Sequence, residues 1–362
     1  MRRMGIEEKY VQIVEAIYTR KAFYVRDAFG ESTKLKQGTG LAQGDPMSCF
    51  LLNIVTTVLL HDASRAWKDT FDQECPNANH FREIFHFDHV LYCDDSNLAN
   101  NTSLGIRIML HAVEREALRY GLTLNFSKTF LLRLGAARHL PTPDLRTLCG
   151  EKVIEKNLAK TLGFPLGGKN SNAQTIKNRL RATRIAMSQY KFIWQSKLSK
   201  KKKIEKYIAL VFSKGTWGFH LLALGKTDFQ KIEREHLRCL RRILRIPAAF
   251  VSRISNDTVL KRAAVPTACA IIRRKQFQLF GHILRLDQDD PDWRVCFQPN
   301  TNCAPVLPPG QHKRKGRHRL RWAETLFDVC KHKYPNMTRQ DIYNLAQDRK
   351  RWRMATWSLS LS

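Results

Sequence analysis

The chain has 362 residues, 43% of them hydrophobic, which is enough for two or three globular domains with cores of their own. Lys and Arg total 62 against 32 Asp and Glu, giving a formal net charge of +30 and a pI near 10.1. Solubility needs only a few charges, so this balance favours a polyanionic partner. Nucleic acid fits better than a membrane, because no run of about 18 apolar residues occurs and the basic residues are spread over many segments. A merely basic soluble protein, such as a ribosome-associated factor, is the alternative.

Nine cysteines are scattered singly, without a CxxC pair, so neither a disulfide framework nor a zinc finger is indicated. The opening residues, MRRMGIEEKY, lack the apolar stretch of a secretory signal. We therefore expect an intracellular chain.

Apolar spacing and turn residues predict mixed helices and short strands in the first part of the chain. In chain order we expect a helix over 6–17, two short strands within 22–36, a buried helix over 49–60, a strand over 86–91 with a return partner over 96–99, and a helix over 106–117 that ends at Gly121.

Beyond a looped region over 141–168 the sequence predicts helices almost throughout. One apolar stripe from Ile176 to Trp194 marks a long helix, so we place the main domain boundary near residue 169. A proline-rich linker is expected over 291–309, and a basic helical tail over 310–362.

Basic residues recur in patterns that could follow a phosphate backbone, because each neutralised phosphate releases counterions. A solvated helix face is the alternative for any single pattern. The candidate nucleic-acid-binding residues are Lys200, Lys201 and Lys202 in one run, and Arg234, Arg238, Arg241 and Arg245 on one predicted helix face.

Two adjacent aspartates, Asp94 and Asp95, lie at the tight turn between two predicted strands. Paired carboxylates are costly to hold side by side unless a cation neutralises them, and hard oxygen ligands suit Mg²⁺ or Mn²⁺. A purely structural turn is the alternative for this pair taken alone.

The order of motifs resembles the palm of reverse transcriptases, and of the non-LTR (LINE-type) retrotransposon kind in particular. Tyr92-Cys93-Asp94-Asp95 is similar to the family's tyrosine, small residue and two aspartates, and GLAQGDPMS over 40–48 resembles its template loop. The resemblance implies that Asp94 and Asp95 bind metal, and that template and nucleotide are positioned by Gln43, Gly44, Pro46, Ser48 and Tyr92. Ala42, where a basic residue is frequent, and Cys49, where proline is frequent, depart from the pattern.

Two later blocks continue the resemblance. YGLTLNFSKT over 120–129 is similar to a block whose lysine, here Lys128, is a candidate for protonating the departing pyrophosphate or for holding the nucleotide phosphates. Leu162 and Gly163 resemble the turn that grips the primer. The segments KLSKKKKIEKY, GTWGFH, HLRCLRRILRIP, RRKQFQLFGHILRL, GRHRLRW and AQDRKRWR are similar to the thumb, connector and tail of LINE-type polymerases.

The resemblance implies RNA-directed DNA synthesis on an RNA template with a DNA primer and deoxynucleoside triphosphates, with two metal ions about 3.5–4 Å apart. In the family one metal-binding aspartate comes from a strand upstream of the first helix expected here. Asp27, four residues after Phe23, mimics that pattern, but the helix precedes it and only 17 residues separate it from Asp45. We therefore expect that this chain alone does not polymerise.

Other readings remain open at this point. A group II intron maturase or a telomerase-like polymerase would share the palm, and a catalytically dead nucleic-acid-binding remnant would keep only the basic surface. A zinc site in the tail would draw on Cys296, Cys303, His312, Cys330 and His332. Tryptophans near basic residues would either stack on bases or simply pack; they are Trp293, Trp322, Trp352 and Trp357.

The expected architecture is an α+β chain in four parts. Residues 1–168 form an incomplete reverse transcriptase palm with a small antiparallel sheet and packed helices, and 169–290 form an all-helical thumb and connector. The linker and the basic tail follow over 291–309 and 310–362. A nuclear location is expected from the resemblance, with no membrane partner.

Overall fold

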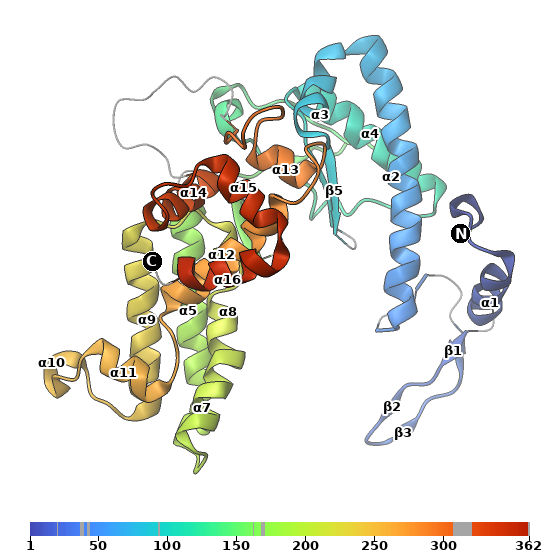
Figure 1. Cartoon of the computed structure of the whole chain (residues 1–362). Helices are drawn as coiled ribbons and strands as arrows, with labels where there is room; N and C mark the ends of the chain where they lie inside the picture. The colour runs from blue at the N-terminus through green and yellow to red at the C-terminus, as the bar shows by residue number, and fades with distance from the viewer. Residues whose placement is uncertain are drawn as a thin grey trace. The chain divides into compact units, whose positions relative to one another are not determined.

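The computed structural model describes residues 1–19, 21–36, 40–41, 44–92, 95–161, 163–167, 171–306 and 321–360 (Figure 1). The chain divides into two compact units. Unit 1 comprises Met1–Glu83, Phe87–Thr129 and Thr142–Ile154, and unit 2 comprises Ile84–His86, Phe130–Pro141 and Glu155–Ser362. The fold therefore mixes helices with small sheets, as the sequence predicts.

The elements up to residue 119 are short apart from two long helices, α2 and α4. In chain order they are η1 (Arg2–Met4), α1 (Glu8–Thr19), β1 (Ala22–Phe23), β2 (Arg26–Asp27), β3 (Gly30–Glu31), β4 (Leu35–Lys36), α2 (Pro46–Glu74), η2 (Pro76–Asn79), α3 (His80–Phe85), β5 (His89–Tyr92), β6 (Asp95–Leu98) and α4 (Ser103–Arg119).

The elements after residue 119 are mainly helical. They are β7 (Phe130–Leu131), η3 (Gly135–His139), β8 (Ile154–Glu155), β9 (Leu158–Thr161), β10 (Phe164–Gly167), α5 (Ser171–Gln189), α6 (Lys191–Gln195), α7 (Lys200–Tyr207), the π-helix η4 (Ile208–Phe212), α8 (Ser213–Gly215), η5 (Phe219–Leu221), α9 (Lys226–Leu244), α10 (Ala249–Ser252), α11 (Asn256–Ala263), α12 (Ala268–Ile283), α13 (Pro291–Cys296), α14 (Trp322–Lys333), α15 (Arg339–Gln347) and α16 (Arg349–Ser360).

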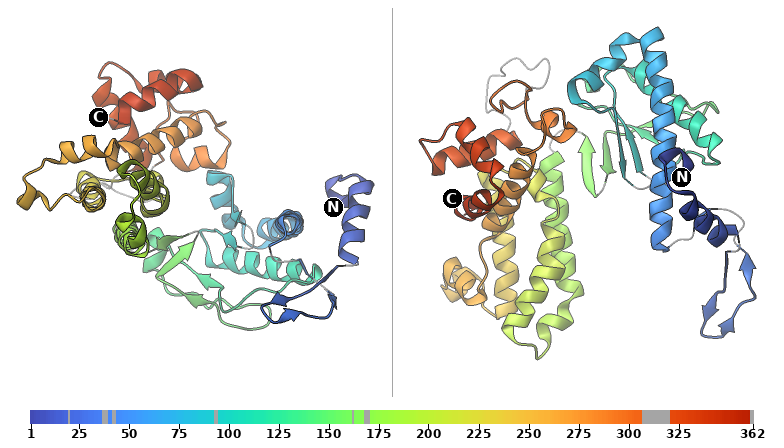
Figure 2. Two further views of the ribbon diagram at one scale, coloured as in Figure 1. Left: turned by 90° about the horizontal axis from the view of Figure 1, so that it is seen from below. Right: turned by 45° about the vertical axis from the view of Figure 1, so that its right-hand side comes forward.

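The core of unit 1 lies where α4 crosses and packs against α2, as both views of Figure 2 show. Trp67 and Phe71 of α2 meet Met109 and Val113 of α4, and Leu91 of β5 packs against the same cluster. The sequence predicts only 49–60 as helix, whereas α2 extends to Glu74 because its later apolar residues continue to face α4. By length and composition alone α2 could also cross a membrane, a test that buried core helices pass as well.

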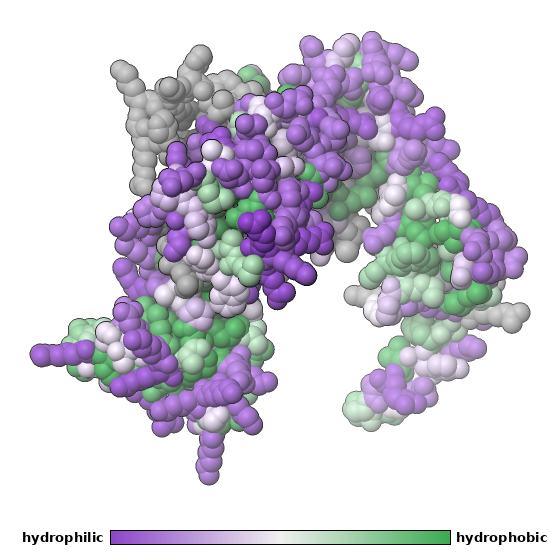
Figure 3. Space-filling view, viewed as in Figure 1, coloured by the Kyte–Doolittle hydropathy of each residue, from purple (hydrophilic) through white to green (hydrophobic). Residues whose placement is uncertain are grey.

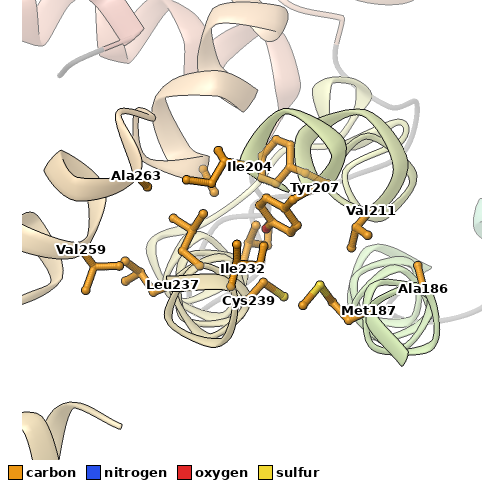
Figure 4. Close-up of a cluster of buried hydrophobic side chains, with 14 of the residues drawn as sticks. Ala186, Met187, Ile204, Tyr207, Val211, Ile232, Leu237, Cys239, Val259 and Ala263 are labelled. Atoms are coloured by element: carbon orange, nitrogen blue, oxygen red, sulfur yellow. The ribbon is translucent and has the colours of Figure 1, made fainter. Parts of the chain in front are cut away.

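Unit 2 has a first core between α5, α7, α9 and α11. Figure 4 shows Tyr207 of α7 among side chains from the neighbouring helices, including Met187, Ile232 and Cys239. The π-helix η4 carries Val211 and Phe212 into this core. The wider helical turn at this point is a local departure from α-geometry.

A second core in unit 2 gathers α12, α13, α14, α15 and α16. Trp293 of α13 and Phe297 are buried in it, and Phe297 forms a β-bridge with Pro305. The prediction of a linker over 291–309 is therefore wrong for residues 291–306. Proline content suggested a spacer, but the aromatic residues between the prolines have enough apolar surface to join the core.

Candidate functional site

The template-loop motif leads directly into helix α2. Gly44 is exposed and has φ +87°, a conformation that favours glycine, and Pro46 occupies the first helical turn. Asp45 is the N-cap residue and accepts a 3.0 Å hydrogen bond from the Met47 N–H. Gln43, predicted to contact the template, lies outside the described residues.

A group of side chains fixes the start of α2 against the end of α1. The Lys21 Nζ lies 3.0 Å from the Asp45 carboxylate, and this bond holds the pKa of Asp45 below its usual value and raises that of Lys21. The same ammonium lies 4.4 Å from the centroid of the Tyr18 ring. The Tyr18 hydroxyl is 3.3 Å from the Ser48 Oγ, so the predicted nucleotide contact Ser48 is a buried partner of α1.

The aspartate motif lies at the end of the β5–β6 hairpin. The antiparallel register pairs Tyr92 with Asp95, so only Cys93 and Asp94 separate the two strands. Tyr92 and Asp95 are both exposed. Within the described part of the chain the Asp95 carboxylate has no ion pair, which leaves its oxygens free for a cation. Asp94 itself lies outside the described residues.

Asp88, which the sequence analysis did not single out, anchors this hairpin. Its buried carboxylate accepts a 3.1 Å bond from Trp67 Nε1 and lies 2.7 Å from His89 Nδ1. Burial alone would raise the pKa of Asp88, but the bond to His89 and the nearby Arg82 charge hold it below its usual value. A sequence signal for this anchoring role was available: Asp88 is the single acidic residue in the mainly apolar and aromatic stretch 84–91.

Lys128 is exposed in a turn that follows α4. Its N–H donates to the Asn125 carbonyl at 3.0 Å, and Thr129 donates to the same carbonyl through its N–H and its Oγ1, also at 3.0 Å. The backbone of this block is therefore fixed while the ammonium stays free to meet a phosphate.

The predicted primer-grip turn joins β9 and β10. Gly163 has φ +83°, and its carbonyl accepts a 3.1 Å bond from Arg179 of α5. Phe164 packs tightly on Gly218, where an added Cβ would lie 1.6 Å from the ring. The hairpin is thus seated on unit 2, to which all of these residues belong. Leu162 lies outside the described residues.

Unit 2 has a basic groove of about 510 Å³ between α5 and α9. Five basic and two acidic side chains line it, an excess of three positive charges. Glu235 is buried and bridges the helices, with oxygens 3.2 Å from Arg184 and 2.5 Å from Arg238. The basic lining residues are Lys177, Arg184, Lys231, Arg234 and Arg238.

The other predicted nucleic-acid contacts divide by burial. Lys200, Lys201 and Lys202 are exposed on the first turn of α7, where the helix dipole disfavours cations and a bound anion would relieve the repulsion. Arg245 is exposed as well, but it lies just past the end of α9 with φ +58°.

Arg241 is a correction to the predicted arginine face. It is only 7% exposed, and its guanidinium donates to the Ile254 carbonyl at 2.7 Å and to Asn256 Oδ1 at 3.1 Å. The chain turns after α9 and folds back over this residue, so Arg241 holds the α9–α11 connection instead of facing solvent.

Among the residues that the structure describes, no group of three or more His, Cys, Asp or Glu side chains could hold a metal ion. Cys303 and Cys330 of the suggested zinc set are buried in the second core, which raises the pKa of Cys303 to about 11 and that of Cys330 to about 12. His312 lies outside the described residues.

Asp27, the mimic of a metal-binding aspartate, has a local structural role. Its Oδ1 accepts hydrogen bonds from the Phe29 N–H at 2.8 Å and the Gly30 N–H at 3.1 Å. It therefore caps the turn of the β2–β3 hairpin, as Asp commonly does.

Residues 3–166 match the family model described as reverse transcriptase (RNA-dependent DNA polymerase). The match contains the template loop, the aspartate hairpin, the Lys128 block and the Gly163 turn. No curated protein matches the chain.

Proposed function

We propose that this chain, whose residues 3–166 are a reverse transcriptase domain, is part of an RNA-directed DNA polymerase of a non-LTR retrotransposon. The observation that carries the proposal is the aspartate hairpin, which lies inside the matched region and presents Tyr92 and Asp95 on an exposed strand end. The motifs quoted beyond residue 169 support the non-LTR type. The same segments disfavour an intron maturase or a telomerase-like enzyme.

Mg²⁺ or Mn²⁺ fits the donor chemistry of the hairpin. Asp95 offers unpaired carboxylate oxygens, and Asp94 adds a second carboxylate in the sequence. Mg²⁺ commonly takes one or two carboxylates and completes its shell with water and substrate phosphates. When bound, the ion would neutralise phosphate charge and lower the pKa of the attacking hydroxyl.

The other site residues have separate tasks in this proposal. No atom of the described residues would lie within 4 Å of a Cβ at Gly44, which lets a template strand approach the backbone closely. Lys128 supplies a positive charge for the nucleotide phosphates. The groove between α5 and α9 and the lysines of α7 bind the backbone of primed template.

The alternative function is a nucleic-acid-binding remnant without polymerase activity. It is favoured by one observation: Asp27, which mimics the family's upstream aspartate in the sequence, is engaged in its own turn. On this basis we propose that the 362-residue chain by itself binds primed template but does not extend it.

The test is a primer-extension assay on an RNA template with deoxynucleoside triphosphates and Mg²⁺, run beside a binding assay at several salt concentrations. Salt-dependent binding without extension supports the remnant. Extension that is lost in Asp95→Asn but kept in Asp27→Asn shows a working polymerase and contradicts the inactivity of the isolated chain. A chain that shows no binding and no extension would contradict both functions.

A further inference from the structure

Helix α16 is fixed closely against α12 in unit 2. Trp352 of α16 donates a 2.9 Å hydrogen bond from its indole nitrogen to the Phe277 carbonyl of α12. Gly281 of α12 makes the close approach possible, because an added Cβ would lie 2.0 Å from Trp352 Nε1. The two helices therefore hold side chains on their common surface in defined positions.

The four tail tryptophans do not share one environment. Trp293 and Trp352 are buried, and Trp322 donates its indole N–H to the His220 carbonyl at 2.7 Å. Trp357 is 54% exposed, and the Arg274 guanidinium carbon lies 3.5 Å from its ring centroid. Packing thus explains three of them, whereas Trp357 has one face covered by a cation and substantial surface open to solvent.

The arginine that covers Trp357 belongs to α12. The Arg274 Nε is buried and has no hydrogen-bond partner within the described part of the chain. A guanidinium over the face of an indole is a favourable arrangement, worth more where water is partly excluded. The pair therefore forms a platform, in which Arg274 covers one face of the indole and the rest of the ring surface stays exposed.

The surroundings of this platform are basic. Neither α12 nor α16 contains an Asp or Glu, and the Asp348 carboxylate before α16 accepts the N–H groups of Lys350 and Arg351 at 2.8 and 3.1 Å. Polar residues make up much of the visible surface around α15 and α16 in Figure 3, beside smaller pale and green areas. The exposed cations of the two helices are Lys275, Arg349, Lys350, Arg351 and Arg353.

Helical spacing places part of this charge beside the platform. Lys350 and Arg353 precede Trp357 by seven and four residues, and Met354 precedes it by three, so they share its face of α16. Within the described residues neither Lys350 nor Arg353 has an ion pair with a carboxylate. They lie about two turns and one turn before the indole on this face and are available for phosphates of a strand that runs along the helix.

We propose that Trp357, backed by Arg274, is a stacking site for a base of single-stranded nucleic acid, with Lys350 and Arg353 contacting the flanking phosphates. Aromatic stacking combined with a basic track is how proteins hold single strands without reading their sequence. The site lies outside residues 3–166 and stands independently of the polymerase function proposed above.

The test measures the affinity of the full chain for 12-nucleotide oligo(U) and oligo(dT), compared with a blunt duplex of the same length. Trp357→Ala is expected to weaken single-strand binding roughly 5- to 150-fold, the range for loss of one stacked base, while Trp357→Phe recovers part of it. Lys350→Gln and Arg353→Gln should each reduce the slope of log affinity against log salt by about 0.7. Comparing oligo(U) with oligo(dT) shows whether the site prefers single-stranded RNA or single-stranded DNA.

Trp217→Ala is the matched control, because Trp217 is 59% exposed but lies outside α12 and α16. Its affinity for the oligomers should stay within about twofold of that of the unchanged chain. Oligomers with 4-thiouridine should cross-link to the tryptic peptide Met354–Ser362. Unchanged affinity in Trp357→Ala, or cross-links only elsewhere, would overturn the proposal. If Trp357→Ala leaves nucleic-acid affinity unchanged but alters self-association of the chain, this surface contacts protein and not nucleic acid.

Discussion

The indole Nε1 of Trp67 donates a 3.1 Å hydrogen bond to the carboxylate of Asp88, and both side chains are buried. This bond joins helix α2 to the residue immediately before β5, and so positions the hairpin that carries the paired aspartates. The same carboxylate is bonded to His89, the first residue of that strand.

Asp88→Ala should therefore destabilise unit 1 by about 2–4 kcal/mol, since it leaves the buried Trp67 indole nitrogen without an acceptor and removes the bond to the half-buried His89 ring. Thermal unfolding measured with and without the substitution checks this. Asp95→Ala is the control: Asp95 is exposed, so its stability should change by no more than about 0.5 kcal/mol. Equal stability of the two variants would contradict the anchoring role of Asp88.

A pH-dependent loss of stability is expected in unit 2. His236 is buried, which lowers its pKa to about 4, and its Nδ1 lies 2.9 Å from the Tyr207 hydroxyl. The folded state holds the neutral ring, so stability is complete above the unfolded pKa near 6.5 and falls as the pH drops towards 4. The loss at pH 4 should approach about 3 kcal/mol.

Urea unfolding followed by far-UV circular dichroism from pH 8 to pH 4 measures this effect. His236→Gln keeps a polar partner for Tyr207 but cannot titrate, so its stability should vary less over that range. Parallel curves for the two proteins would show that another group is responsible.

The arginines of α9 should separate into binding and structural residues. Arg234→Gln removes an exposed cation of the groove, so it should weaken duplex binding without changing stability. The slope of log affinity against log salt concentration should become smaller in magnitude by about 0.9. Arg241→Gln should instead lower stability by about 1–3 kcal/mol, because it breaks the bonds to Ile254 and Asn256. Duplex affinity and melting temperature of both variants decide this, and the reverse pattern would contradict the assignment.

The β9–β10 hairpin should depend on a glycine far from it in sequence. Gly218→Ala places a Cβ against the Phe164 ring and strains a backbone with φ +79°, so unit 2 should lose about 1–3 kcal/mol. Gly5→Ala is a control with φ +70° but open space around it, and it should cost less. Thermal unfolding compares them, and similar losses would mean that backbone strain, not the contact with Phe164, dominates.

Local patterns in the sequence predicted several elements well. The apolar spacing over 106–117 with Gly121 as its end is confirmed by α4, and the strands flanking the aspartates are confirmed within a few residues by β5 and β6. Gly121 has φ +68°, which explains why glycine stands there. Apolar spacing and a terminating glycine depend only on neighbouring residues, so the sequence alone is enough to predict these elements.

Features that depend on contacts between distant residues were missed or wrong. The burial of Arg241 requires the chain to fold back after Arg245, and the anchoring of Asp88 requires Trp67 to lie beside it. The linker prediction failed because proline spacing says nothing about which aromatic residues find a core. The roles predicted for Asp94, Gln43 and Leu162 fall outside the described residues and stay predictions.

The most direct test of the central claim is the binding of Mn²⁺, followed by electron paramagnetic resonance, to the chain with primed RNA template and a deoxynucleoside triphosphate. This measurement reports the metal site even if the isolated chain extends no primer. We predict that Asp95→Asn weakens Mn²⁺ binding at least about tenfold, whereas Asp27→Asn leaves it unchanged. Equal binding by both variants and the unchanged chain would contradict the assignment of the aspartate hairpin as the metal-binding site.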